Sequence, residues 1–121
     1  MSDETQKLAR LLKVLSVDTR VQIVQLLKGR ALCVNALAAR LNVTQGAVSQ
    51  HLRILRDAGL VIDEKRGFYV HYRLNEQTLA KWREAICQLL DSGEEASSYK
   101  KGAKTCVAAM KTKKAVKNQK T

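Results

Sequence analysis

The stretch that decides the fold is Cys33–Gly59, with the sequence CVNALAARLNVTQGAVSQHLRILRDAG. Apolar residues recur at helical spacing over Val34–Leu41, which predicts a short helix there. Thr44 can cap a second helix with its hydroxyl, and that helix is expected to run from Gln45 to about Ala58. Gly59 ends it, because glycine readily takes the left-handed conformation that closes a helix. The stretch is therefore predicted to be two helices joined by a tight turn.

The second of these helices has two different faces. Val48, Leu52 and Leu55 form an inward apolar stripe. The outward face carries amides, a hydroxyl and small residues in its N-terminal half, where an ordinary solvated face would mix Glu and Lys. Amides and hydroxyls pair with base edges, and small residues let a helix lie deep in a groove. We therefore interpret it as a recognition helix for double-stranded DNA, with these candidate DNA-binding residues: Thr44, Gln45, Gly46, Ser49, Gln50 and Arg53.

Three further helices are predicted around this stretch. The first carries a leucine seam between Leu8 and Leu15. Ser16 can cap the second, which is apolar on more than one side and ends at Gly29. Asn75 can cap the last, which runs from Glu76 to about Leu90. Leucine seams at both ends exceed what so small a core needs, so we expect a homodimer through the first and last helices.

After Gly59 the apolar period changes from that of a helix to that of a strand. Leu60–Arg66 and Phe68–Leu74 are two extended runs around Arg66-Gly67, a dipeptide suited to a tight turn. Lys65 and Arg66 at the tip are placed to reach DNA phosphates. His71 is expected on the outer, solvated face of this hairpin.

Charge divides the chain into a domain and a tail. The net charge is +11, yet all eleven acids precede residue 96, and eight lysines follow from Lys100 onward without an acid. We expect a DNA-binding and dimerisation domain over residues 1–92 and a flexible Lys-rich tail over 93–121. The tail is either a solubilising appendage or a contact for a polyanion. No apolar run suits a membrane span and the polar start is unlike a signal peptide, so a cytoplasmic location without a membrane partner is expected.

The predicted fold is mainly α with a small β-hairpin, a winged helix-turn-helix in the order α-α-α-α-β-β-α. Over residues 8–90 the chain resembles the ArsR/SmtB family of winged-helix repressors. The segments that carry the resemblance are LKVLSVDTRVQIVQLLKG, where Val17-Asp18 replaces the usual Asp-Pro, then VTQGAVSQHLRILRDAGLV and EKRGFYVHYRL. The resemblance implies a homodimeric transcriptional repressor that binds an inverted-repeat operator and is released by an effector.

The sensing residues of that family are mostly missing here. Arsenite sensors of the family use three cysteines at the start of the third helix, and this chain keeps Cys33 with Asn35 and Ala38 in the other positions. The zinc sensors place Asp, His and Glu ligands on the last helix. The corresponding positions here are Thr78, Gln88 and Ser92, none of which is a usual zinc ligand.

The remaining candidates for an effector site are the three cysteines. Cys87, Cys106 and Cys33 are odd in number and lack the spacing of a disulfide framework, so reduced thiols are expected. As thiolates they suit arsenite, antimonite, copper(I) or a zinc-group metal, and a Cys87–Cys106 disulfide is the redox alternative. Cys33 and Cys87 could instead only fill space in packing.

No pattern in the sequence predicts an enzyme. The chain has no phosphate-cradling glycine loop, no paired carboxylates in an apolar setting, and no nucleophile with a nearby histidine base. His51, on the flank of the recognition helix, is expected to be a hydrogen-bonded histidine. Two alternatives to a repressor stay open: an architectural winged helix with little sequence specificity and no effector, and a protein-interaction module.

Overall fold

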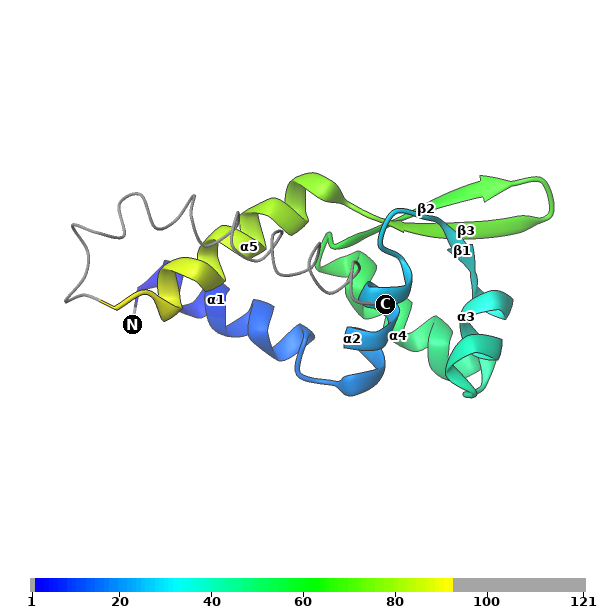
Figure 1. Ribbon diagram of the computed structural model, residues 1–121, viewed down its shortest axis with the longest axis horizontal. Helices are drawn as coiled ribbons and strands as arrows, with labels where there is room; N and C mark the ends of the chain where they lie inside the picture. Colours follow the sequence, from blue (N-terminus) through cyan, green and yellow to red (C-terminus); the bar gives the residue numbers. More distant parts are fainter. Residues whose placement is uncertain (1, 93–121) are drawn as a thin grey trace, which may run out of the picture. The chain divides into compact units, whose positions relative to one another are not determined.

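The structure, a computed structural model, describes residues 2–92 (Figure 1). The described residues divide into two compact units, a first that extends to Lys81 and a second that begins at Trp82. The elements follow one another in this order: α1 (Asp3–Val14), α2 (Asp18–Leu26), β1 (Leu32–Cys33), α3 (Val34–Leu41), α4 (Gln45–Asp57), β2 (Val61–Arg66), β3 (Tyr69–Leu74) and α5 (Glu76–Leu90). The predicted winged helix-turn-helix order is confirmed, with one strand added. Helix α5 begins in the first unit and continues into the second.

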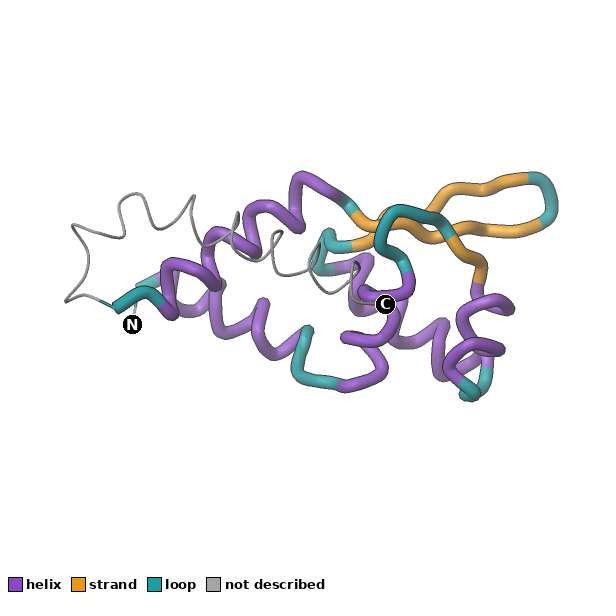
Figure 2. Tube along the Cα trace, in the orientation of Figure 1, coloured by secondary structure: helices purple, strands orange, loops and turns teal. Residues whose placement is uncertain are grey.

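The added strand makes the wing a three-stranded antiparallel sheet in the order β1-β3-β2 (Figure 2). Strands β2 and β3 pair from Val61 opposite Leu74 to Arg66 opposite Tyr69. Strand β1 pairs Leu32 with Tyr72 and Cys33 with His71. Strands β2 and β3 form the predicted hairpin, whereas β1 was not predicted, because two residues are too short to show an alternating pattern.

The hairpin turn lies one residue later than predicted. Arg66 is still paired with Tyr69, so the two loop residues are Gly67 and Phe68. Gly67 has a φ of 63°, a left-handed value that suits the first central position of a type II′ turn. The glycine therefore decides where the chain reverses.

The start of α2 also differs from the prediction. Val17 occupies the N-cap position without a side-chain hydrogen bond. The Ser16 hydroxyl instead donates to the Lys13 carbonyl at 2.7 Å, which satisfies an acceptor at the end of α1. At the first position of α2, the Asp18 carboxylate accepts from the Thr19 N–H at 2.7 Å.

The core of the first unit lies where α2, α3 and α4 meet the start of β2. Its most deeply buried side chains are Ile23, Leu27, Leu37, Val48, Leu52, Leu55, Leu60 and Val61. These large apolar side chains hold α3 and α4 in one fixed arrangement. None of the helices in residues 2–92 is long and apolar enough to cross a membrane.

Candidate nucleic-acid interface

The turn between α3 and α4 consists of three residues, Asn42, Val43 and Thr44. Asn42 takes a left-handed conformation, φ 56° and ψ 46°, which asparagine tolerates better than most residues. The Val43 N–H then bonds to the Ala38 carbonyl at 3.2 Å. Thr44 is extended, and its Oγ1 accepts from the Ala47 N–H at 3.1 Å. The predicted cap is confirmed, and the hydroxyl of Thr44 serves the helix start.

The end of α4 is closed by a pair of hydrogen bonds around Gly59. The Gly59 N–H bonds to the Arg56 carbonyl at 2.8 Å, and the Leu60 N–H bonds to the Leu55 carbonyl at 2.9 Å. Gly59 has a φ of 82°, as this Schellman arrangement requires. Leu60 and Leu55 are both fully buried, which adds the apolar contact typical of the motif. Both ends of α4 are thus fixed independently of any ligand.

The outward face of α4 is open to solvent. All six candidate residues on it are exposed: Thr44, Gln45, Gly46, Ser49, Gln50 and Arg53. Within residues 2–92, no hydrogen bond or ion pair engages the side chains of Gln45, Ser49, Gln50 or Arg53. The inward stripe of Val48, Leu52 and Leu55 is fully buried, as predicted. The helix therefore presents unengaged amide, hydroxyl and guanidinium groups on a rigid support.

Gly46 has no internal reason to be a glycine. It is helical, and a Cβ built on it meets nothing within 4 Å. Glycine inside a helix costs up to about 1 kcal/mol relative to alanine. The fold alone would therefore accept a larger residue at this position.

Arg56, next along this side of α4, is tied to the sheet. Its Nη1 lies 3.5 Å from the Asp63 carboxylate on β2, and its Nε lies 3.9 Å from Asp57. The ion pair links the C-terminal turn of α4 to the base of the hairpin. Arg56 is thus less available to a ligand than Arg53, a difference that helical spacing alone cannot reveal.

The predicted phosphate-binding residues lie at the hairpin tip. Lys65 and Arg66 are both exposed, and Lys65 has no ion pair within the described part of the chain. Arg66 lies 3.4 Å from the Glu64 carboxylate, which also accepts a hydrogen bond from Arg73. Hydrogen bonds from Arg73 and then Arg66 lower the pKa of Glu64 below its ordinary value. At the tip, Arg66 is therefore held by an acidic side chain, whereas Lys65 is not.

His51 is hydrogen-bonded, as the sequence indicated. Arg20 of α2 donates from Nε to His51 Nδ1 at 3.2 Å and from Nη1 to the Val14 carbonyl at 3.2 Å. Burial, and then the Arg20 charge, lowers the pKa of His51, against a smaller opposing effect of Asp18. One guanidinium thus joins the middle of α4 to the last turn of α1. No sequence pattern indicates this partner, which lies 31 residues away.

The cysteines do not form a metal site within residues 2–92, where no group of three His, Cys, Asp or Glu side chains could hold an ion. Cys33 is half-buried at the N-cap of α3, and Cys87 is half-buried on α5 in the second unit. Cys106, and with it the predicted Cys87–Cys106 pairing and the Lys-rich tail, lies outside the described residues.

His71 is half-buried, not solvated as expected, and its Nδ1 has no hydrogen-bond partner in the described region.

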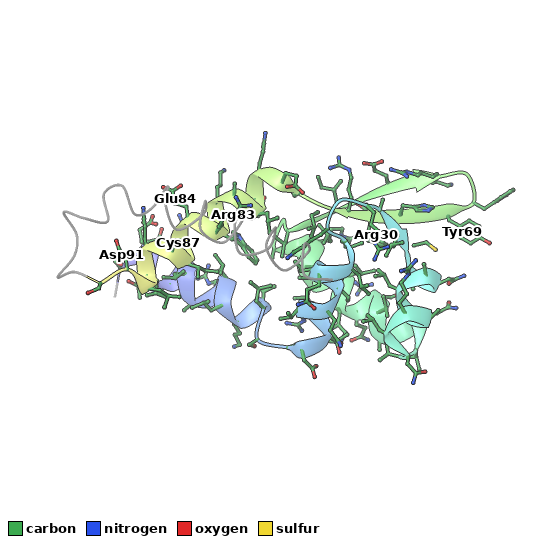
Figure 3. The ribbon with its side chains drawn as sticks, viewed as in Figure 1. Arg30, Tyr69, Arg83, Glu84, Cys87 and Asp91 are labelled. Atoms are coloured by element: carbon green, nitrogen blue, oxygen red, sulfur yellow. The ribbon has the colours of Figure 1, made fainter. Side chains whose placement is uncertain are left out.

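Figure 3 labels side chains of both units, among them Cys87 on α5 and Tyr69 on β3. The Tyr69 side chain extends from the hairpin near its tip. The alternation along the hairpin predicts that Val70 packs inward and Tyr69 faces outward, but both are exposed at the tip, as is Phe68. A run of consecutive apolar residues at a turn was the signal that could have drawn attention to them.

Comparisons with known proteins agree on the kind of molecule. Residues 18–63 match the family described as bacterial regulatory protein, arsR family. The chain is 45% identical over 67 residues to the arsenical resistance operon repressor of Escherichia coli (strain K12), covering 54% of this chain and 57% of that one. The chain thus spans little more than half the length of that relative.

Two solved structures share the fold. A crystal structure of a possible transcriptional regulator for arsenical resistance has a TM-score of 0.64 and 37% identity, covering 74% of this chain and 94% of that chain. The second is the solution structure of the homodimeric winged helix-turn-helix DNA-binding domain of a possible ArsR-family regulator from Mycobacterium bovis. It has a TM-score of 0.60 and 27% identity, covering 78% of this chain and 89% of that chain. These proteins are named as regulators, not enzymes, which agrees with the lack of a catalytic pattern in the sequence.

Proposed function

Because the chain belongs to the ArsR family of bacterial regulatory proteins, we propose that it is a transcriptional repressor that binds double-stranded DNA through α4 and the hairpin. The observation that carries the proposal is the exposed face of α4, with its unengaged Gln45, Ser49 and Gln50. With DNA as its proposed partner, the protein is expected in the cytoplasm. The family match and the named repressor among the relatives support the same function.

The two parts of the interface have different roles in this proposal. Gln45, Ser49 and Gln50 read base edges in the major groove, while Gly46 allows the helix start to approach the bases. Thr44 and Arg53 lie at the two ends of this reading segment and bind the flanking backbone. Lys65 and Arg66 bind phosphates, which fixes the orientation but carries no sequence information.

We further propose a symmetric dimer that binds an inverted repeat. Leu12 of α1 is exposed, as are Leu89 and Leu90 of α5, the last with 77% of its surface accessible. Exposed leucines on helices favour burial against a second copy. The homodimeric Mycobacterium bovis domain supports the same arrangement. Two copies of α4 would enter successive major grooves about 34 Å apart.

The effector is proposed to be a soft metal or metalloid ion, or an oxidant, that acts on the thiols. Arsenite, antimonite, copper(I) and zinc-group ions all favour thiolate ligands. The candidates are Cys87 and Cys106, with Cys33 in a lesser role. Single Cys→Ser variants of each test this, because DNA binding should survive while release by the best inducer is abolished at 87 or 106. Normal release from a variant lacking both Cys87 and Cys106 would contradict it.

Selection of bound sites from a random duplex library tests the proposed function. A repressor should enrich an inverted repeat with half-sites one or more helical turns apart, and bind it about 10³-fold or more tightly than random DNA. An architectural protein would bind with steep salt dependence but enrich no repeat. An interaction module would not bind DNA at moderate salt, and either of these results would reject the repressor.

A further inference from the structure

Three consecutive apolar residues are exposed at the tip of the hairpin. Phe68 is fully exposed, Tyr69 is 56% exposed and Val70 is 38% exposed. Single exposed apolar residues are ordinary, but runs of three or more work against solubility unless they serve a function. Phe68 is also the only phenylalanine of the chain, so the residue best suited to fill a core is left in water. The fold does not explain this run.

The strand register places a cation beside each apolar strand residue of the tip. Arg66 lies opposite Tyr69, and Lys65 lies opposite Val70. Residues directly opposite in an antiparallel pair have their side chains on the same face. Strand β1 pairs only with His71 and Tyr72, so the tip beyond them is a two-stranded ribbon. The ribbon thus ends in an aromatic ring with positive charge immediately behind it.

The hairpin tip extends toward the same side of the first unit as the part of α4 that is proposed to read bases (Figure 1). Strand β2 leaves the C-terminal end of α4, and its six residues span about 20 Å. Helix α4 has 13 residues and is also about 20 Å long. Figure 1 shows the hairpin tip and the start of α4 extending toward the same side of the view. A tip so placed can reach the groove next to the one that α4 enters, which is the minor groove.

We propose that Phe68 is a wedge that enters the minor groove, stacks on a base-pair step and bends the DNA. This inference rests on the proposed DNA-binding function. Apolar side chains inserted between base steps partly unstack them and kink the duplex toward the major groove. Lys65 and Arg66 bind the phosphates on either side of the opened step. A membrane anchor would use the broad apolar face of an amphipathic helix, whereas this tip is narrow.

The test uses the full-length protein on its selected DNA site, with a bend measured by energy transfer between dyes at the duplex ends. A 2-aminopurine placed at the step under the tip reports unstacking by an increase in fluorescence. Wild-type protein should produce both signals. Phe68→Ala should remove both and weaken binding about tenfold, and Phe68→Trp should restore them. Val21→Ala, at an exposed apolar residue of α2, is the matched control and should change neither signal.

The possible results separate this inference from the proposed function. If wild-type and Phe68→Ala proteins bind the site with equal bend and equal fluorescence, the wedge is rejected and the repressor stands. If wild-type protein shows no preference for any DNA sequence, the proposed function fails and the wedge with it. Cosedimentation with anionic vesicles that depends on Phe68, together with unchanged DNA bending, would reject the wedge in favour of a lipid contact.

Discussion

At the scale of single residues, a substitution of Gly46 should affect the stability of the fold and the proposed DNA binding in opposite directions. Its Cβ position is open, and the residue is helical. Gly46→Ala should therefore stabilise the protein by about 0.5 kcal/mol, because alanine loses less backbone entropy on folding. The same methyl group should weaken binding to the selected DNA site at least about fivefold, roughly 1 kcal/mol. Thermal unfolding and DNA titration of one variant measure both, and unchanged affinity would mean that the helix does not approach the bases there.

His51 gives a second prediction at this scale, one of pH dependence. Because burial and Arg20 lower the pKa of His51 in the folded state, the unfolded chain binds the proton more readily. The stability that depends on a neutral His51 is fully present above about pH 6.5, the ordinary histidine pKa. It is lost as the pH falls through the lower pKa of the folded state. The free energy of unfolding should thus decrease on acidification in this range.

His51→Asn keeps an acceptor near the position of Nδ1 without the titration. Denaturant unfolding from pH 7.5 to 5 should show a flatter profile for this variant than for wild type. If the free energy of unfolding depends equally on pH in the two proteins, protonation of His51 does not destabilise the fold. Arg20→Lys serves as a companion variant, because lysine cannot donate to both His51 and the Val14 carbonyl with the guanidinium geometry.

At the scale of elements, the sequence predicted what local chemistry decides. Helix α4 begins and ends within one residue of its predicted bounds, because Thr44 and Gly59 cap it through neighbours in the chain. Strand β1 was missed because its two residues find their partners on β3, some forty residues away. The Arg20–His51 hydrogen bond and the Arg56–Asp63 ion pair likewise join separate elements, so no local sequence pattern predicts them. The exposed face of α4 followed from helical spacing, whereas the ion pair that ties Arg56 of this helix to the sheet did not.

The hairpin gives the prediction that belongs to this scale. Glu64 holds Arg66 and Arg73 and adds a negative charge near the proposed phosphate-binding residues. Glu64→Gln should therefore strengthen binding to selected and random duplexes alike by about two- to fivefold at low salt. The free energy of unfolding should hardly change, because exposed ion pairs contribute little.

Arg66→Ala is the matched opposite change and should weaken binding to both duplexes. Competition titrations at several salt concentrations measure the two variants together. Weaker binding by the Glu64→Gln protein would mean that Glu64 positions Arg66 for DNA, and that its charge is not the dominant effect.

At the scale of the whole molecule, charge is concentrated at the C-terminal end. The eight lysines from Lys100 onward supply most of the net charge of +11. If they bind phosphates, removal of residues 100–121 should reduce the slope of log K against log salt by about 0.9 for each phosphate that is no longer neutralised. The preference for the selected site should be retained, because charge carries no base code. An unchanged slope would show that the tail takes no part in DNA binding.

Base reading by the exposed face of α4 depends most directly on Gln50, near the middle of that face. The measurement is the ratio of affinities for the selected inverted repeat and a random duplex, for wild type, Gln50→Ala and the control Gln22→Ala on the exposed side of α2. Gln50→Ala should lose roughly 1–3 kcal/mol on the selected site and little on random DNA, so the ratio falls. The control should keep the wild-type ratio. Equal weakening on both duplexes by Gln50→Ala would contradict base reading by this helix.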